Sequence, residues 1–326
     1  MECRLSYSSP VCSVDAARDR LALLGLEVRR LVKTWAPPLS LELNLMNGDA
    51  NKPGATPRFL LHEVTRQEAA RRAANALVVL PLGATEQHGP HLPLGTDFLI
   101  VEHITRAAAQ EARRSIDVLV PPTLQFGSSH HHLPFGGTIS LSTERYYAAL
   151  SDMTESLIES GFRRVFILNG HGGNHEIIQL VARDLSLKHA INLGAASYWD
   201  LAREALAAHE PDLQGRLPGH AGVFETSVIM TLRPDLVDVA LPHRSDEELA
   251  RTIVPPAPFR VERHGFWGSI DGYTDSPDQA QPELGQRLLE IIVPTVATAL
   301  VNFAQLALMG SETGDNQTLR AQSLRG

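Results

Sequence analysis

Four segments of the chain gather histidine and carboxylate side chains at short spacing. The first, GATEQHGPHLPLGTD at 83–97, holds Glu86, His88, His91 and Asp97. The others are LQFGSSHHHLPFGGTIS at 124–140, NGHGGNHE at 169–176 and GHAGVFETS at 219–227. Imidazole and carboxylate groups are ligands that Zn²⁺, Mn²⁺ and Fe²⁺ accept in proteins. These segments therefore predict a metal centre.

The spacing within the first segment favours two metal ions rather than one. Glu86 and His88 are two residues apart, so on an extended segment both side chains point the same way and each can reach one ion. Two ions a few ångströms apart need a shared carboxylate, and Asp97, at the start of the next helix, is placed to bridge them. The turn that holds His171 has glycine at 170, 172 and 173, which lets the imidazole approach closely.

The same segments are less compatible with other kinds of chemistry. NGHGGN could form a phosphate-binding loop, but it matches neither common phosphate-loop pattern and has no lysine nearby. The side chains of the three consecutive histidines at 130–132 diverge, so at most two of them can face one ion. A role for one of them in substrate contact or proton transfer is therefore favoured over a cluster of three metal ligands. The serines at 128, 129 and 140 lack the G-x-S-x-G elbow of serine hydrolases, which disfavours a serine nucleophile.

Strands and helices alternate along the part of the chain that carries these segments. Short apolar runs predict strands at 76–83, 116–122, 163–173 and 191–200. Helical spacing predicts helices at 65–74, 97–113, 145–161, 175–189 and 284–308, and a helix followed by a turn within 221–240. The alternation predicts an α/β protein: a three-layer α/β/α sandwich around a mostly parallel sheet of about four strands. Ligands bind beyond the carboxyl ends of such strands, where the polar segments fall.

Composition excludes several classes of protein. The chain has 326 residues, 43% of them hydrophobic, with 29 Lys+Arg against 37 Asp+Glu and a formal net charge of −8. This balance argues against a nucleic-acid partner. The sequence contains no run of 18 apolar residues, so it predicts no membrane-spanning helix. There are 14 His but only 2 Cys, Cys3 and Cys12, which excludes a disulfide scaffold and a thiolate metal site in the body of the protein.

The two ends of the chain differ from its middle. We expect residues 1–57 to form a poorly ordered N-terminal extension, residues 58–308 a single metallohydrolase domain, and residues 309–326 a polar tail. The linker-like stretch 48–58 is rich in Gly, Pro, Asn and Asp, and Met46 just before it is a candidate alternative start of translation. The apolar run at 21–28 lacks the basic start and the length of a secretory signal, which predicts a cytoplasmic protein.

The motifs GATEQHGPHLPLGTD, GGTISLS, FILNGHGGN, SYWD and HAGVFETS together resemble the creatininase (creatinine amidohydrolase) family, over about residues 60–305. The resemblance implies a four-stranded parallel sheet between helix layers and a binuclear site of Zn²⁺, Mn²⁺ or Fe²⁺. It also implies a hydrolase that acts on non-peptide C–N bonds, commonly those of cyclic amides or formamides, and often a homo-hexamer.

The resemblance assigns roles to individual positions of this chain. The residues that match are Glu86 and His171 as ligands of one metal, His88 as a ligand of the second, Asp97 as the bridge, His220 as the catalytic histidine and Glu225 as the acid of the ETS motif. Substrate contacts are predicted for His131, His132, Trp199 and Asn174.

Two departures from creatininase itself mark this chain. Gly172 and Gly173 stand where that enzyme has a tyrosine and then a ligand glutamate, so Glu225 becomes the best candidate for the missing carboxylate. Trp199 matches the first of two pocket tryptophans, but the second would fall near Arg216, where the chain has no Trp. NGHGGN is instead typical of a branch that includes formamidopyrimidine deformylases and a mycofactocin maturation peptidase.

These features predict a metal-dependent amidohydrolase that cleaves a non-peptide C–N bond of a small molecule. Metal-activated water would attack the amide carbonyl, and His220 would carry the proton to the leaving nitrogen. The sequence leaves two alternatives open. One is a peptidase that trims a modified peptide on the same metals, and the other is a metal-binding protein without catalysis, whose site would have no open coordination position.

Overall fold

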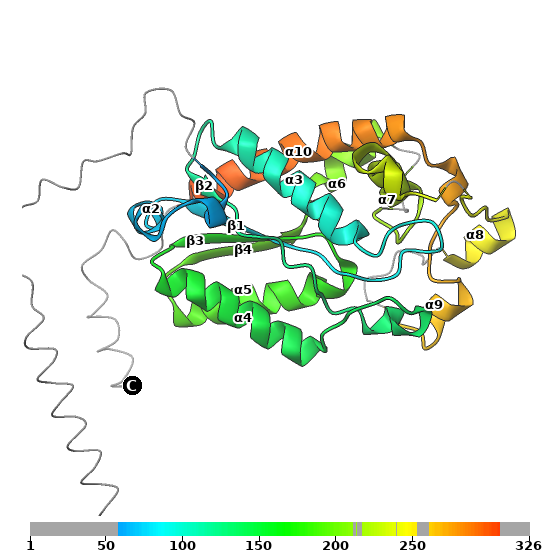
Figure 1. Ribbon diagram of the computed structural model, residues 1–326, viewed down its shortest axis with the longest axis horizontal. Coiled ribbons are helices and arrows are strands. Elements are labelled where there is room, and N and C mark those ends of the chain that lie inside the picture. The colour runs from blue at the N-terminus through cyan, green and yellow to red at the C-terminus, as the bar shows by residue number, and fades with distance from the viewer. Residues whose placement is uncertain (1–57, 211–212, 214–216, 239, 253–260, 307–326) are drawn as a thin grey trace, which may run out of the picture. The chain divides into compact units, whose positions relative to one another are not determined.

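The computed structural model describes residues 58–210, 213, 217–238, 240–252 and 261–306 (Figure 1). These residues make up most of the predicted metallohydrolase domain. The predicted N-terminal extension at 1–57, the predicted polar tail at 309–326 and Arg216 lie outside the described residues.

A four-stranded parallel sheet forms the middle layer. Its strands are β1 (Leu77–Leu82), β2 (Val118–Leu119), β3 (Arg164–Asn169) and β4 (Asn192–Ser197). They lie in the order β2-β1-β3-β4, and every pairing is parallel. The pairing of β1 with β3 runs from Leu77 opposite Arg164 to Leu82 opposite Asn169, so both strands end level with each other. The loops that follow them therefore begin side by side.

Helices cover both faces of the sheet (Figure 1). On one face lie α3 (Thr96–Ala112), α6 (Tyr198–His209), α7 (Val223–Leu232) and α10 (Pro282–Ala304), and on the other α4 (Thr143–Glu159) and α5 (His175–Lys188). Shorter helices are α2 (Arg66–Arg72), α8 (Asp246–Thr252) and α9 (Phe266–Ser269). The predicted three-layer α/β/α sandwich is confirmed.

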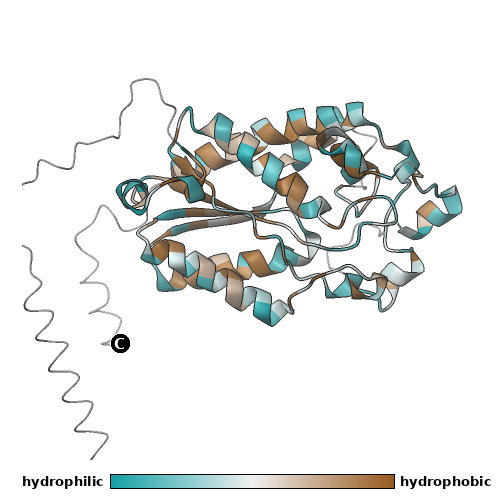
Figure 2. Ribbon diagram, viewed as in Figure 1, coloured by the Kyte–Doolittle hydropathy of each residue, from teal (hydrophilic) through white to brown (hydrophobic). Residues whose placement is uncertain are grey.

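The strand sequences explain why both faces are covered. Every residue of β1 is buried, as expected for a strand in a parallel sheet with helices on both sides. Side chains alternate between the faces: Leu77 and Val79 pack in the core beneath α3 and α10, whereas Leu80 and Leu82 pack in the core beneath α4 and α5. In Figure 2 the apolar residues accordingly lie in the sheet and on the helix sides that face it.

Helix α10 is long and apolar enough to cross a membrane by length and composition alone. Polar residues interrupt its sequence, so the helix contains no unbroken run of 18 apolar residues. The helix is instead a core element, because it packs against α3, α6 and α7. Its buried residues fall at helical spacing on one side: Gly285, Leu288, Leu289, Ile292, Val293, Val296, Ala297 and Leu300.

Two predicted strand ends were wrong. The strand expected at 191–200 ends at Ser197, and α6 begins at Tyr198. Tyr198, Ala202 and Leu206 recur at helical spacing and bury one side of α6, so SYWD opens a helix instead of closing a strand. The strand expected at 116–122 likewise ends at Leu119. The strand within 163–173 ends at Asn169 and runs into the glycine-rich turn, as predicted.

Candidate metal centre

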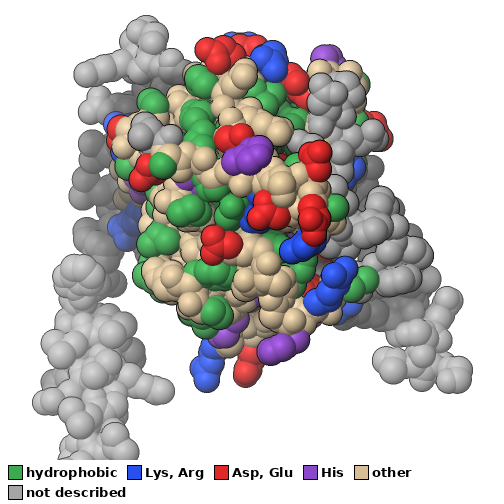
Figure 3. Space-filling model, turned by 90° about the vertical axis from the view of Figure 1, so that its right-hand side faces the viewer, with side chains coloured by type: hydrophobic (Ala, Val, Ile, Leu, Met, Phe, Trp, Pro, Cys, Tyr) green, Lys and Arg blue, Asp and Glu red, His purple; other side chains and the backbone are tan. Residues whose placement is uncertain are grey.

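The four polar segments meet beyond the carboxyl ends of the strands. Together they line a cavity of about 980 Å³ that is bounded by side chains from the loops after β1 and β3, from α6 and from α9. This end of the molecule faces right in Figure 1 and faces the viewer in Figure 3, where acidic, basic and histidine side chains are mixed among apolar ones.

Asp97 lies between two imidazoles, one on either side of its carboxylate. Its Oδ1 is 3.2 Å from Nε2 of His88, and its Oδ2 is 3.0 Å from Nδ1 of His171. Oε1 of Glu86 is 3.3 Å from the same nitrogen of His171, and Oε2 of Glu225 is 3.8 Å from Nε2 of His88. The side chains of all five residues are buried. The structure thus brings together every metal ligand predicted from the sequence.

The oxygens at the centre of this cluster are short of hydrogen-bond donors. Both carboxylate oxygens of Glu86 and Oδ2 of Asp97 are buried and accept no hydrogen bond among the described residues. Leaving ionised oxygens in this state is costly unless a cation compensates them. The donor set, carboxylate with imidazole, is one that Zn²⁺, Mn²⁺ and Fe²⁺ accept. The residues present therefore fit divalent metal ions.

Candidate donors divide into overlapping groups whose ligand atoms lie within 4.8 Å of one another. One group is His88, Asp97 and Glu225, which contains the glutamate predicted to supply the second metal's missing carboxylate. Another is Glu86 and His171 with His131, a residue predicted to contact substrate. A third contains Glu86, His88 and His220. The first two groups share no residue and so form two separate sets of candidate donors.

The pKa shifts of the cluster reflect burial and crowded charge. Burial alone would lower the pKa of His88, but Asp97 raises it to about 10. Burial alone would raise the pKa of Asp97, yet His88 and His171 hold it below its usual range. Burial raises the pKa of Glu225 to about 8, against the effect of His88. Without a cation, therefore, protons and histidine charges balance the carboxylates.

Hydrogen bonds behind the ligands set their orientation. Nδ1 of His88 donates to the backbone oxygen of Glu86 at 3.1 Å, so its Nε2 faces the cluster. Nε2 of His171 lies 3.1 Å from the backbone oxygen of Ser128, so its Nδ1 faces the cluster. Such outer hydrogen bonds are the usual way in which proteins fix the tautomer of a ligating histidine. Both rings are thus oriented for metal binding.

Glycine at position 173 is required by close packing. A Cβ there would lie 2.1 Å from the backbone oxygen of Ser128 and 2.6 Å from Nε2 of His171. Any side chain at 173 would collide with the carbonyl that orients His171.

His220 lies beside the carboxylates and opposite a wall of aromatic rings. Its Nδ1 is 3.6 Å from Oε1 of Glu86, and its Nε2 is 2.9 Å from the backbone oxygen of Gln87. Burial lowers the pKa of His220 well below its usual value, which keeps the ring neutral at pH 7. A neutral imidazole at this place can accept a proton.

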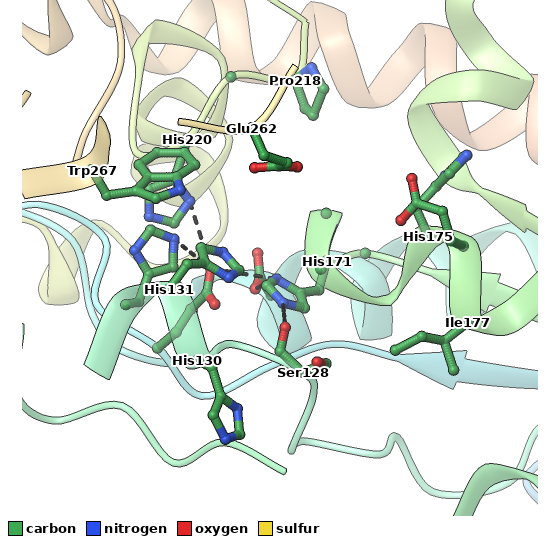
Figure 4. A pocket seen from close by; sticks show the side chains of 18 of the residues that line it. Ser128, His130, His131, His171, His175, Ile177, Pro218, His220, Glu262 and Trp267 are labelled. Atoms are coloured by element: carbon green, nitrogen blue, oxygen red, sulfur yellow. Dashed lines mark hydrogen bonds and ion pairs between the residues drawn. The ribbon is translucent and has the colours of Figure 1, made fainter. Parts of the chain in front are cut away.

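The residues predicted to contact substrate fall into two sets. His131, His132 and Trp199 line the cavity. His130 lines it as well, and its ring bonds Ser140 (Figure 4). Asn174 is fully buried and does not line the cavity. Its amide accepts from the backbone N–H of Ser128 and donates to the backbone oxygen of Gly83. We therefore propose a positioning role for Asn174 in place of the predicted substrate contact.

Replacing Asn174 with alanine is expected to lower the free energy of unfolding by about 3 kcal/mol, because buried partners on two loops lose their hydrogen bonds. Urea unfolding measures the change. Asn75→Ala is the control: its side chain is exposed, and such substitutions change stability by less than about 0.5 kcal/mol. Equal stability of the two variants would contradict the positioning role.

Two residues of the site were missed in the sequence. Trp267, on α9, packs its ring against His132 at 4.6 Å and His220 at 5.2 Å between centroids (Figure 4). No motif surrounds it, so only its proximity in space to the histidines reveals it. The other is Gln87, which lies between two predicted ligands in the sequence and contacts His132 and His220.

A parallel α/β sheet with a buried cluster of imidazoles and shared carboxylates at its carboxyl edge defines a metal-dependent hydrolase of the α/β class. Residues 62–300 match the family model for creatininase, described as creatinine amidohydrolase. The chain therefore belongs to the creatininase family, as the motifs predicted.

Individual relatives agree with this membership. The chain is 30% identical over 252 residues to creatinine amidohydrolase of Pseudomonas putida, covering 72% of this chain and 92% of the relative. It is 34% identical over 165 residues to the mycofactocin precursor peptide peptidase of Mycobacterium ulcerans, covering 49% of this chain and 60% of the relative. A solved structure described as Creatininase Mn superposes with a TM-score of 0.64 at 27% identity, covering 77% of this chain and all of that one.

Proposed function

We propose that this protein is a metal-dependent amidohydrolase that cleaves a non-peptide C–N bond of a small molecule, such as a cyclic amide or a formamide. The observation that carries the proposal is the position of Asp97, whose two oxygens face His88 and His171 on opposite sides, amid buried carboxylate oxygens that accept no hydrogen bond among the described residues. The two cations, Zn²⁺, Mn²⁺ or Fe²⁺, would be held by Glu86, His88, Asp97, His171 and Glu225.

When bound, the cations supply positive charge for the amide carbonyl and lower the pKa of water at the site towards about 7. The chain's own residues transfer the proton and position the substrate. Nδ1 of His220 takes the proton of the attacking water and returns it to the leaving nitrogen. The oxygen of water bonds to the carbonyl carbon first, and the C–N bond then breaks as the nitrogen takes the proton, which yields a carboxylic acid and an amine. Cavity residues such as Trp199 and His132 hold the substrate in place.

Metal analysis followed by a turnover panel tests the proposal. The purified full-length protein, loaded in turn with Zn²⁺, Mn²⁺ and Fe²⁺, is assayed against creatinine, formamides and short peptides. Turnover of a cyclic amide or formamide that disappears with chelator and returns with metal is the expected result. Tight metal binding without turnover of any of these amides would favour the non-catalytic alternative, and cleavage of peptides alone would favour a peptidase.

The size of the cavity favours a peptide-trimming activity as the second candidate. About 980 Å³ is at the upper end of the range of ligand pockets, and a molecule as small as creatinine fills only part of it. The outer part is lined by charged side chains, including Asp200, Arg203 and Glu262, which suit the polar groups of a longer substrate. The identity with mycofactocin precursor peptide peptidases points the same way.

Trp267 is proposed to form one wall of the substrate site. Replacing it with alanine is expected to raise KM about tenfold, because a ring contact and the shape of the wall are lost together. Trp267→Phe keeps an aromatic wall and serves as the matched control, with KM within a few-fold of the parent protein. Steady-state kinetics on the best amide of the panel measures both. If the alanine variant keeps the parental KM, Trp267 does not contribute to substrate binding.

The assembly, location and partners of the protein are also proposed. We propose that the protein assembles as a homo-oligomer, a hexamer by resemblance, and works in the cytoplasm on a small-molecule amide, with neither nucleic acid nor membrane as partner. Light scattering of the purified protein measures the assembly state.

A further inference from the structure

The side-chain amide of Gln87 is held in one orientation by two backbone groups. Its Oε1 accepts from the N–H of Gly89 at 2.9 Å, and its Nε2 donates to the carbonyl of Gly272 at 2.7 Å. A backbone N–H can only donate and a carbonyl can only accept, so the amide cannot be turned round without losing both bonds. Gln87 is buried, which makes such a loss costly.

The fixed amide lies between two histidines and determines where their protons are. Nε2 of His220 is 2.9 Å from the backbone oxygen of Gln87, an acceptor, so this nitrogen carries the proton. It therefore cannot accept from the amide of Gln87, 3.1 Å away. The second amide hydrogen of Gln87 then goes to Nδ1 of His132, at 2.8 Å. His132 must accept through Nδ1, and its own proton lies on Nε2.

The two rings consequently present a donor N–H and an acceptor nitrogen towards the same carboxylate, that of Glu86. Nε2–H of His132 is buried, has no hydrogen-bond partner among the described residues, and is 3.6 Å from Oε1 of Glu86. The bare Nδ1 of His220 is also 3.6 Å from that oxygen. The rings are stacked, with centroids 4.2 Å apart and planes 14° apart. One histidine offers a donor and the other an acceptor, side by side.

We propose that Gln87 is a positioning residue that fixes both tautomers, so that His132 donates to the substrate's carbonyl oxygen while His220 accepts the proton of water. The tautomers follow from hydrogen bonds alone, whereas the roles of the two groups rest on the proposed amide hydrolysis. The ring of His132 is neutral in this arrangement, because its Nδ1 accepts the amide hydrogen of Gln87 and carries no proton of its own. A neutral donor aimed at the carbonyl oxygen supplies the stabilisation of developing negative charge that oxyanion holes provide.

Nitrogen-15 NMR of histidine tautomers tests the positioning role directly. The full-length, zinc-loaded protein is labelled at histidine, and the signals of residues 132 and 220 are assigned from His132→Asn and His220→Asn spectra. Both rings are expected to carry the proton on Nε2. In Gln87→Glu a carboxylate faces Nδ1 of His132, so the proton of that ring is expected to move to Nδ1. The inference would be overturned if His132 of the parent protein carried its proton on Nδ1, or if the tautomer of His132 were unchanged in Gln87→Glu.

Kinetics separates the tautomer from a general loss of structure. Gln87→Glu is expected to lower kcat about 100-fold, the effect of losing one oxyanion donor, with KM and metal content within a few-fold of the parent. Gln87→Met, which removes the hydrogen bonds at similar size, is expected to leave a mixture of tautomers and an intermediate kcat. Gln179→Glu is the matched control, because Gln179 is exposed and bonds His175 instead.

The two proposals fail in different ways. If the parent protein hydrolyses no amide but shows the expected tautomers, the proposed function fails and the positioning role of Gln87 stands. If amide hydrolysis is found and Gln87→Glu loses metal with its tautomers unchanged, the function stands and the inference fails.

Discussion

Replacing Asp97 with alanine is expected to remove the bound metal and the hydrolytic activity together. Both oxygens of this carboxylate face the centre, one towards His88 and one towards His171, so a single substitution takes a ligand from each of the two proposed metal positions. We expect the metal content to fall from the proposed two ions to fewer than one after dialysis. We expect kcat/KM to fall about 1,000-fold or more, since the reaction depends on the charge of the metal ions.

The measurement combines elemental analysis with kinetics on the best amide of the turnover panel. Asp246→Ala is a matched control, because Asp246 also lies in the first turn of a helix but does not line the cavity. The control should keep the parental metal content and rate. Circular dichroism shows whether each variant is folded, and Asp97→Asn, of nearly the same shape, provides a second variant if alanine is not tolerated. An Asp97 variant that is fully active without metal would refute the mechanism.

Replacing His220 with alanine is expected to abolish most activity while leaving the metal in place. In the proposed reaction His220 transfers a proton and is not needed as a ligand, because His88, Asp97 and Glu225 form a donor group without it. General acid–base catalysis by one side chain contributes about 10²- to 10⁴-fold, and kcat should fall by that factor. KM should change much less, because other side chains line most of the cavity.

His209→Ala is the control for His220, since His209 is an exposed residue on α6 that bonds the backbone of its own helix. Metal content and kcat are measured on the same preparations. Loss of metal in His220→Ala would show that His220 is a metal ligand, which agrees with its place in a candidate donor group with Glu86 and His88. Unchanged kcat would exclude it from proton transfer altogether.

The clustering of the candidate ligands could be predicted from the sequence because local spacing places them. Glu86 and His88 share one segment and Asp97 opens the next helix, so the end of β1 supplies three candidate ligands by itself. The parallel sheet then brings His171 from the end of β3 to the same edge, which follows from the strand order. Strong local patterns combined with one rule of topology therefore sufficed for this half of the site.

Other parts depend on contacts between distant residues. Gln87 bonds His220 and Gly272, which are 133 and 185 positions away in the sequence, and no local pattern reports such pairs. Trp267 reaches the histidines because α9 packs against the segment His130–Phe135. Asn174 lies within a recognisable motif, yet only its buried hydrogen bonds reveal that it joins two loops. Composition and periodicity contain none of this information.

Glycine at position 173 limits how a carboxylate ligand could be introduced at this place. By the resemblance described above, creatininase itself has a ligand glutamate there, whereas here the carbonyl of Ser128 occupies the space a side chain would need. A glycine-to-glutamate change alone would displace the loop that orients His171. A new ligand at position 173 therefore requires a coupled change in the 124–140 loop.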